Sequence, residues 1–371
     1  MAGIINTEEI GKLGFGYMRL PRKGDAFDME LVKKMADTFL ESGGTYFDAA
    51  FIYTGAEAAL RESVIQRHPR EKIQIATKLA LSFVKDPKQF REQFNVSMDR
   101  LGTDYLDFYL LHGMDAESSD KAEDFGAWAF FSELKAKGLV RHIGFSFHAP
   151  PEELEEILSK HPETEFVQLQ INYLDWDNPG IQSRKLYEIA RKYNTPIVIM
   201  EPVKGGLLAS DTSQITELLR SANPNASMAS WALRYAAQLE GVFVTLSGMS
   251  TYEQLLDNIN TFADLQPISD DEQAVLDKAA EILKAIPSIT CTSCRYCVDS
   301  CPSLIHIPKM FDIYNNYLVY NTIANLDSEY RMWTRNGGKA GDCTSCRVCE
   351  SICTQKLEIS DKMAKISELF D

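Results

Sequence analysis

All eight cysteines of this 371-residue chain lie in two short runs in its last quarter. The first run, CTSCRYCVDSCP, spans residues 291–302, and the second run, CTSCRVCESICT, spans residues 343–354. Both have the spacing C-x2-C-x2-C-x3-C, and no cysteine precedes residue 291. Eight thiols this close together restrict what this part of the chain can fold around. They also set it apart from the longer segment before it.

This spacing is typical of cysteines that bind iron–sulfur clusters. In two-cluster ferredoxins the fourth cysteine of each run ligates the cluster of the other run. Applied to this chain, the rule predicts two [4Fe-4S] clusters, the first held by Cys291, Cys294, Cys297 and Cys353 and the second by Cys343, Cys346, Cys349 and Cys301. Pro302 follows the first run as that pattern expects, whereas Thr354 replaces the second proline. The two runs resemble a ferredoxin-type domain with residues 303–342 inserted, and the apolar, aromatic start of this insert favours a packed helix.

Zinc and disulfides are the alternatives for these thiols. Zinc sites usually join two separated C-x2-C pairs around one tetrahedral ion, which triplets of cysteine fit poorly. The N-terminal sequence MAGIINTEEIGKLGFG lacks the basic start and long apolar core of a signal peptide. No apolar run approaches the roughly 18 residues needed to cross a bilayer. We therefore expect a cytoplasmic chain that is not a membrane protein, and disulfides are rare in that compartment.

The composition is that of an ordinary globular protein, with 45% hydrophobic and 25% charged residues. A net charge of −15 argues against nucleic acid as a partner, because such binding needs a basic face. The length suits two domains. We expect a first domain of residues 1–285 and a second of residues 286–371, joined through the segment IPSIT before Cys291.

Short apolar runs alternate with amphipathic helical patterns through the first 285 residues. Eight runs are predicted to be strands, at residues 12–18, 45–50, 73–79, 105–112, 141–147, 166–172, 196–202 and 242–248. The first helical pattern between them has Asp28 as its N-cap and ends at Gly43. Eight strands alternating with helices over about 250 residues are typical of an α/β fold, the (β/α)8 TIM barrel. The chain is thus predicted to be such a barrel followed by a small ferredoxin-like domain.

Polar residues stand at the ends of three neighbouring predicted strands, where active sites of such barrels gather. Asp48 ends the second strand, Lys78 the third and His112 the fourth. Tyr53 lies in the loop after the second strand. A lysine ammonium beside a tyrosine stabilises the phenolate and lowers its pKa from about 10. The set suits a proton donor to a carbonyl oxygen while a hydride reaches the carbonyl carbon.

The segments FDAAFIYTGAEAALRESV, ATKLAL and LLHG are similar to motifs of the aldo-keto reductase superfamily, and the resemblance covers residues 13–263. It implies that Tyr53 is the general acid, that Lys78 and Asp48 tune it, and that His112 orients the substrate. The whole chain resembles the subgroup with a fused C-terminal ferredoxin-type domain. The resemblance predicts an oxidoreductase acting on a carbonyl or alcohol, with two clusters for electron transfer.

Members of that family bind a nicotinamide dinucleotide over the barrel mouth. The resemblance and a loop suited to phosphate predict cofactor contacts from Ser146, Gln170, Met200, Lys204, Gly205, Gly206 and Asn258. Met200 replaces the family's stacking aromatic residue, and Phe147 replaces its asparagine. Gly248 and Gln254 replace the lysine and arginine that grip the 2′-phosphate of NADP. Loss of these two charges favours NADH over NADPH.

Electron counting leaves other functions open. A [4Fe-4S] cluster carries one electron at a time, whereas a nicotinamide gives two as a hydride. FMN, which handles both, is therefore an alternative cofactor, and a ferredoxin or flavodoxin would be the partner of a flavin-linked enzyme. A redox-sensing scaffold is a third hypothesis. Candidates for the walls of a substrate pocket are Tyr17, Met18, Arg19, Trp128, His148 and Trp176.

Overall fold

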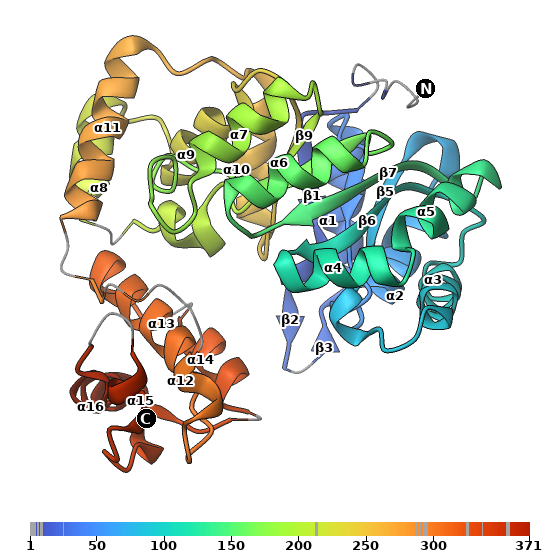
Figure 1. The fold of residues 1–371 in the computed structure, drawn as a ribbon. Coiled ribbons are helices and arrows are strands. Elements are labelled where there is room, and N and C mark those ends of the chain that lie inside the picture. The colour runs from blue at the N-terminus through green and yellow to red at the C-terminus, as the bar shows by residue number, and fades with distance from the viewer. Residues whose placement is uncertain are drawn as a thin grey trace. The chain divides into compact units, whose positions relative to one another are not determined.

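The computed structural model describes residues 5, 7, 10–24, 26–211, 214–285, 288–289, 291, 296–323, 326–335, 337–353 and 357–371. The chain divides into two compact units. The first consists of Met1–Gly205 with Ala229–Ser269, and the second consists of Gly206–Met228 with Asp270–Asp371. Figure 1 shows both units, each with its own set of elements.

A closed barrel of eight parallel strands forms the centre of the first unit. The strands are β1 (Leu13–Gly16), β4 (Tyr46–Asp48), β5 (Gln74–Leu79), β6 (Leu106–Met114), β7 (Val140–Phe147), β8 (Phe166–Gln170), β9 (Ile197–Met200) and β10 (Val242–Ser247). Neighbours in this order pair with one another, and β10 pairs with β1 to close the ring. Each overlaps one of the eight predicted strands, so the (β/α)8 prediction is confirmed. A short hairpin of β2 (Arg22–Lys23) and β3 (Ala26–Phe27) is an addition that the strand pattern did not predict.

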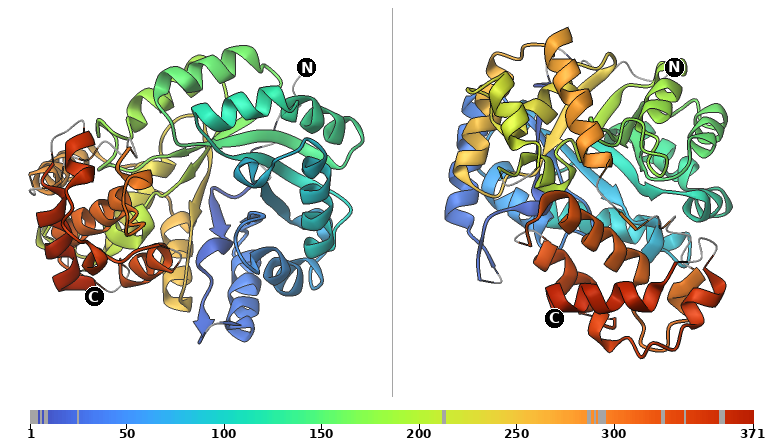
Figure 2. Two further views of the ribbon diagram at one scale, coloured as in Figure 1. Left: turned by 60° about the horizontal axis from the view of Figure 1, so that its bottom comes forward. Right: turned by 90° about the vertical axis from the view of Figure 1, so that its left-hand side faces the viewer.

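Helices surround the strands on the outside, as Figure 2 shows. They are α1 (Met29–Glu41), α2 (Ala56–Leu60), α3 (Lys88–Leu101), α4 (Ala116–Asp124), α5 (Ala127–Ala136), α6 (Pro151–Lys160), α7 (Ser183–Lys192), α9 (Met228–Ala237) and α10 (Tyr252–Ala263). Short 3-10 or π segments are η2 (Tyr17–Arg19), η3 (Arg61–Ile65), η4 (Arg70–Lys72), η5 (Leu81–Phe83) and η6 (Lys204–Ala209). The Asp28 side chain accepts a hydrogen bond from the Leu31 amide at 3.3 Å, which confirms it as the N-cap of α1.

The alternation of side chains along the strands determines which way the polar residues at the strand ends point. Side chains of a strand alternate between its two faces. Tyr46, Ala76 and Phe108 belong to one apolar cluster, formed by residues of this alternate set on several strands. Two residues further along β4 and β5, Asp48 and Lys78 therefore face the same interior, one layer closer to the carboxyl ends of the strands. The sequence alternation thus places polar groups directly above an apolar floor.

The second unit is helical in the part that the structure describes. Its helices are α8 (Thr216–Ala222), α11 (Asp270–Lys284), α12 (Tyr296–Asp299), α13 (Ile307–Tyr320), α14 (Leu326–Thr334), η7 (Ala340–Asp342), α15 (Val348–Ile352) and α16 (Ile359–Phe370). Helix α13 confirms the helix predicted after the first cysteine run. An isolated parallel bridge joins Ile305 to Gly338.

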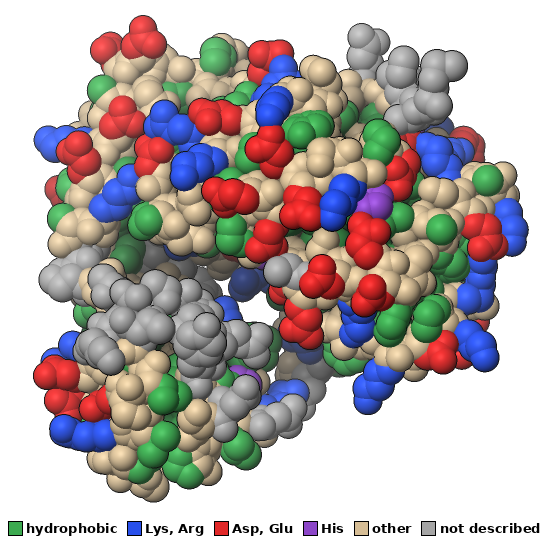
Figure 3. Space-filling model, in the orientation of Figure 1, with side chains coloured by type: hydrophobic (Ala, Val, Ile, Leu, Met, Phe, Trp, Pro, Cys, Tyr) green, Lys and Arg blue, Asp and Glu red, His purple; other side chains and the backbone are tan. Residues whose placement is uncertain are grey.

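Two general properties complete the description. None of the helices in the described ranges is both long and apolar enough to span a bilayer. On the face drawn in Figure 3, acidic and basic side chains are interspersed over the helices of the barrel.

Candidate functional site

A buried ion pair lies at the mouth of the barrel. The Lys78 side chain is only 1% exposed, and its Nζ donates to Asp48 Oδ1 at 2.5 Å and to the Ala49 carbonyl oxygen at 2.7 Å. Burial lowers the pKa of Lys78, but the Asp48 carboxylate and the nearby Tyr53 outweigh it and leave that pKa above its ordinary value. The ammonium therefore stays charged. Asp48 Oδ2 is buried and has no partner among the described residues.

Tyr53 stands next to this ion pair, in the loop after β4. Lys78 Nζ lies 5.1 Å from the centroid of its ring. No described residue forms a hydrogen bond with the Tyr53 hydroxyl, so this group is available to a bound molecule. Burial raises the pKa of Tyr53 and outweighs the opposing charge of Lys78. The expectation of a lowered pKa is therefore wrong for the protein by itself, because the ring is largely removed from water.

His112 faces Tyr53 from β6. The two ring centroids are 5.7 Å apart and the rings are nearly perpendicular, at 83°. Burial, with the charges of Lys78 and His148, lowers the pKa of His112 to about 3. The imidazole is therefore neutral at physiological pH, and its buried Nδ1 has no partner in the described part of the chain. The pairing register between β6 and β7 shifts between Leu111 and Met114, which flank His112. Such irregularities in a strand pair are common beside active sites.

Ser146 occupies an interior position near the end of β7. Its side chain is buried, and its Oγ accepts a hydrogen bond from the Gly113 amide at 2.8 Å. Gly113 has a φ of +67°, a conformation that glycine adopts without strain. Because this bond uses only a lone pair of the hydroxyl oxygen, the hydroxyl hydrogen of Ser146 remains able to donate.

A second polar cluster joins the loops after β8 and β9. The completely buried carboxylate of Asp175 accepts from Gln170 Nε2 at 2.9 Å and from Asn172 Nδ2 at 2.8 Å. Lys204 Nζ donates to both oxygens of the same carboxylate, at 2.8 and 3.0 Å. The structure thus pairs Lys204 with Asp175, although the sequence suggested that this lysine meets a phosphate. No sequence motif marked Asp175 as a site residue. Its contacts with Gln170, Asn172 and Lys204 place it at the site.

The remaining predicted cofactor residues lie near the ends of β9 and β10. Met200 ends β9 and pairs in register with Gln170 of β8. Gly205 and Gly206 have φ angles of +66° and +98°, which suit glycine. Asn258 is buried on α10, and its Nδ2 donates to Ser247 Oγ at 2.6 Å.

Arg19 supplies a positive charge at the same mouth, in the turn after β1. A Cβ placed on Gly205 would lie 3.2 Å from Arg19 Nη2, and one on Gly248 would lie 3.5 Å from the aliphatic part of Arg19. Gly205 and Gly248, in the loops after β9 and β10, thus lie against the Arg19 side chain. The guanidinium has no hydrogen bond or ion pair with any residue that the structure describes. The sequence marked Arg19 only as a candidate pocket wall.

Two other candidate pocket walls lie elsewhere. Tyr17 is completely buried, and its hydroxyl pairs with Ser63 Oγ at 3.0 Å, on the helical side of the sheet. Trp128 is buried on α5 and stacks on His161, with ring centroids 4.1 Å apart. These two predictions are wrong, because large aromatic side chains here fill the space between sheet and helices.

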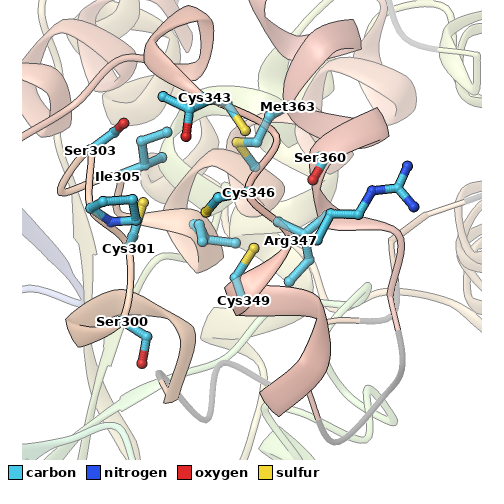
Figure 4. Close-up of a pocket in the computed structure, with 14 residues that line it drawn as sticks. Ser300, Cys301, Ser303, Ile305, Cys343, Cys346, Arg347, Cys349, Ser360 and Met363 are labelled. Carbon is cyan, nitrogen blue, oxygen red and sulfur yellow. The ribbon is translucent and has the colours of Figure 1, made fainter.

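Four cysteines surround one pocket in the second unit. The pocket holds about 340 Å³ of empty space, part of it open to solvent, and its lining includes Cys301, Cys343, Cys346 and Cys349. Figure 4 shows these thiols around the pocket and the Arg347 guanidinium directed away from it. Cys301 thus joins the three cysteines of the other run, as the crossed ligand set requires. Burial, with nearby acidic groups and thiols, raises the pKa of Cys349 to about 11.

A single zinc ion would need four of these sulfurs to converge on one point, each about 2.3 Å from the metal. Among the described His, Cys, Asp and Glu side chains, no group of three or more is arranged to hold one metal ion.

The other predicted ligand set is described in part. Cys291, Cys297 and Cys353 lie in the described ranges, whereas Cys294 and the neighbouring Thr354 lie outside them. Cys297 is buried on α12, and Cys353 directly follows α15. Helices α12 and α15 pack against each other, which brings the two cysteine runs together.

Comparisons with protein families match two consecutive parts of the chain. The model of the aldo/keto reductase family matches residues 12–281. A model described as a 4Fe-4S dicluster domain matches residues 290–358.

Similar proteins have been named as aldo-keto reductases. Aldo-keto reductase str7 of Strobilurus tenacellus is 29% identical over 217 residues, which are 55% of this chain and 61% of that protein. The chain therefore spans less than two thirds of that relative. An aldo-keto reductase of Mycobacterium sp. (strain MCS) is 27% identical over 256 residues, covering 68% of this chain and 83% of that protein.

Solved structures share the barrel. The holo form of aldo-keto reductase AKR11C1 from Bacillus halodurans aligns with a TM-score of 0.59 at 24% identity, covering 72% of this chain and 92% of that one. An aldo-keto reductase from Klebsiella pneumoniae in complex with NADPH aligns with a TM-score of 0.59 at 20% identity, covering 72% of this chain and 90% of that one. At these identities the likeness shows the fold.

Proposed function

The chain belongs to the aldo/keto reductase family and carries a C-terminal 4Fe-4S dicluster domain, and on this premise we propose that it reduces a carbonyl compound, or oxidises the alcohol, at the barrel mouth. It is thus an oxidoreductase. The observation that carries the specific proposal is the gathering of Tyr53, Lys78 and His112 around a hydroxyl that no described residue engages. We assign the barrel chemistry to residues 1–285 and the clusters to residues 286–371.

Tyr53 is the proton donor in this proposal. Its raised pKa keeps the phenol protonated at neutral pH, ready to give its proton to the carbonyl oxygen. The phenolate that results lies beside the Lys78 ammonium, which Asp48 holds in place. This charge pair is stronger away from water, so it favours the proton transfer once substrate closes the mouth.

His112 orients the carbonyl group. Its lowered pKa keeps the imidazole neutral, so it can donate one hydrogen bond without adding a second positive charge beside Lys78. The edge-on contact with Tyr53 places the two rings next to each other at the barrel mouth. Among the described residues, the buried Nδ1 of His112 and Oδ2 of Asp48 have no hydrogen-bond partner, so a bound molecule or water can satisfy them.

A nicotinamide dinucleotide fits the residues beside this group. When bound, it supplies a hydride to the carbonyl carbon. Ser146 offers a hydrogen-bond donor and Gln170 an acceptor to its carboxamide, while Met200 packs against the ring. Arg19 takes the role of phosphate-binding cation that the sequence suggested for Lys204, because Lys204 is paired with Asp175. The NADPH complex of the Klebsiella protein gives this assignment general support.

We propose NADH as the preferred dinucleotide. The loop after β10 has no side chain at Gly248, and Gln254 is engaged, since its Oε1 accepts from the Ser250 amide at 2.8 Å. A 2′-phosphate would thus lack the two cations that it meets in the family. Comparing the affinities of NADH and NADPH by calorimetry tests this preference, and a tighter complex with NADPH would contradict it.

The second unit is proposed to bind two [4Fe-4S] clusters through the eight cysteines. The clusters, when bound, supply one-electron transfer. A ferredoxin or flavodoxin is the kind of partner that exchanges single electrons with such a domain. FMN is the alternative cofactor of the barrel, and flavin released on denaturing the purified protein would identify it.

Replacement of Tyr53 by phenylalanine tests the barrel chemistry. General acids contribute roughly 10²- to 10⁴-fold to turnover. We expect Tyr53→Phe to lower kcat for NADH-dependent carbonyl reduction by that range, with NADH affinity unchanged. Tyr105→Phe is a matched control, because Tyr105 precedes β6 at the opposite end of the barrel and stacks on Arg70 and Arg141. Full turnover by Tyr53→Phe would exclude the assigned role.

A further inference from the structure

We propose that Asp175 is a positioning residue that fixes the hydrogen-bonding direction of Gln170, so that the barrel mouth selects a cofactor ring bearing an N–H donor. This inference rests on the proposed function, because it concerns how the same site reads the nicotinamide carboxamide. Asp175 itself lies behind Gln170 and is assigned no contact with the cofactor.

The argument begins with what each group can donate. An ionised carboxylate only accepts hydrogen bonds, whereas a glutamine amide has a donor end and an acceptor end. Gln170 Nε2 lies 2.9 Å from Asp175 Oδ2, so the nitrogen end of this amide must face Asp175. The oxygen end, Gln170 Oε1, is then turned the other way and can only accept.

The surroundings hold the Asp175 side chain in place. Its carboxylate is completely buried, and it accepts two bonds from Lys204 Nζ and one from Asn172 Nδ2. Asn172 is itself fixed, because its Oδ1 accepts from the Asp175 amide at 2.9 Å and its Nδ2 also donates to the Glu201 carbonyl oxygen at 3.1 Å. The carboxylate thus accepts hydrogen bonds from a lysine and from two amide nitrogens. The cluster therefore cannot turn Gln170 around without losing a bond.

Gln170 lies near Ser146, so the orientation of its amide decides which hydrogen-bonding groups the barrel mouth presents. It ends β8 and has the same facing as Gln168, which pairs in register with Ser146 of β7. Ser146 Oγ accepts from the Gly113 amide, which leaves its hydrogen to donate. Neighbouring strands thus present one donor, at Ser146, and one acceptor, at Gln170. A primary carboxamide matches them, since its carbonyl oxygen accepts and its N–H donates.

A pair of dinucleotides tests this matching. The 3-acetylpyridine analogue of NADH carries a methyl ketone in place of the carboxamide, so it keeps the carbonyl oxygen and loses the N–H. Both molecules have the same charge, which removes any effect of changing the charge at residue 175. For the full chain prepared without oxygen, calorimetry should show about tenfold weaker binding of the analogue, the usual effect of one unmet hydrogen bond.

The variant Asp175→Asn should remove this gap in affinity between NADH and its 3-acetylpyridine analogue. An asparagine has a single side-chain oxygen, for which Lys204 and Asn172 compete, so Gln170 Nε2 is no longer held toward residue 175 and Gln170 can turn to present its nitrogen to the ketone. We expect the affinities for the two dinucleotides to come within about twofold of each other. Asp177→Asn is the matched control, because Asp177 lies on the same loop but pairs with Arg184 at the surface, at 2.7 Å. It should keep the wild-type gap.

The outcomes separate this inference from the function on which it rests. If the wild-type chain binds neither dinucleotide, the proposed function and this inference both fail. If both bind and Asp175→Asn keeps the tenfold gap, the inference fails alone. If Asp175→Asn does not fold, Gln170→Met decides, since loss of the amide oxygen should also close the gap. A gap that persists in Gln170→Met would overturn the role given to Gln170 and with it that of Asp175.

Discussion

Lys78 is a charged side chain held almost wholly out of water, and one carboxylate and one carbonyl offset the cost of its desolvation. Breaking a buried ion pair by removing one member costs about 3–5 kcal/mol, because the other charge is left unpaired. We expect both Asp48→Asn and Lys78→Met to lower the free energy of unfolding by that order. Urea titration followed by tryptophan fluorescence measures the change.

The double variant gives the control for this pair. Asp48→Asn combined with Lys78→Met removes both charges, and apolar replacement of a whole buried pair is often close to neutral. It should therefore be more stable than either single variant, although inactive. If the effects of the two single changes simply add, the pair is not what holds these side chains in the barrel.

The histidine at the mouth gives the protein a defined response to acid. An unfolded histidine has a pKa of 6.5, whereas folded His112 has a pKa of about 3. Between these values the unfolded chain binds a proton that the folded chain excludes, so stability falls as the pH drops below 6.5. Between about pH 7 and about pH 5.5 the wild type should lose about 1 kcal/mol more than His112→Gln.

Comparing the two proteins at each pH isolates this contribution, because the clusters and other carboxyl groups are common to both. Urea titrations at several pH values provide the measurement. Parallel loss of stability in wild type and His112→Gln would mean that His112 is protonated in the folded protein.

Close packing between β7 and β8 depends on Gly144. A Cβ at this position would lie 2.3 Å from the Phe166 carbonyl oxygen and 2.8 Å from its ring. Because backbone cannot move aside cheaply, we expect Gly144→Ala to destabilise the barrel by about 3 kcal/mol. Gly180→Ala is the control, since Gly180 is exposed and its φ lies outside the left-handed region, and its effect should stay within about 0.5 kcal/mol. Thermal unfolding compares the two.

Strands and their end residues could be predicted because both follow from local alternation. Asp48, Lys78 and His112 each fall on the interior-facing set of a strand that the apolar pattern had marked. The pairing of Lys204 with Asp175 could not be predicted, because it joins residues 29 positions apart with no shared motif. The raised pKa of Tyr53 also escaped prediction, since burial depends on the whole mouth and not on its neighbours in sequence.

The crossed arrangement of cysteines predicts how the whole chain loses iron. Cys301 belongs to the first run by sequence but shares a pocket with Cys343, Cys346 and Cys349 of the second. Cys301→Ser should therefore disturb the cluster of the second run and lower the iron content from about eight to about four per chain. Iron and sulfide analysis of protein prepared without oxygen measures this.

Ser300→Ala is the neighbouring control, because Ser300 lines the same pocket without offering a thiol. It should keep the full iron content. Additional replacement of Cys343 in the Cys301→Ser background should remove no further iron if the two residues serve one cluster. A further loss to near zero would assign them to different clusters.

The shared pocket also has a consequence for the order of events during biosynthesis. A ribosome delivers Cys301 before it delivers Cys343, Cys346 and Cys349, so the pocket that these four line has no complete set of thiols until the chain has emerged as far as Cys349. By then the barrel sequence has left the exit tunnel and can already have folded. Insertion of the proposed cluster into this pocket is therefore a late step in maturation, and a chain that stops within residues 303–342 lacks three of the four thiols.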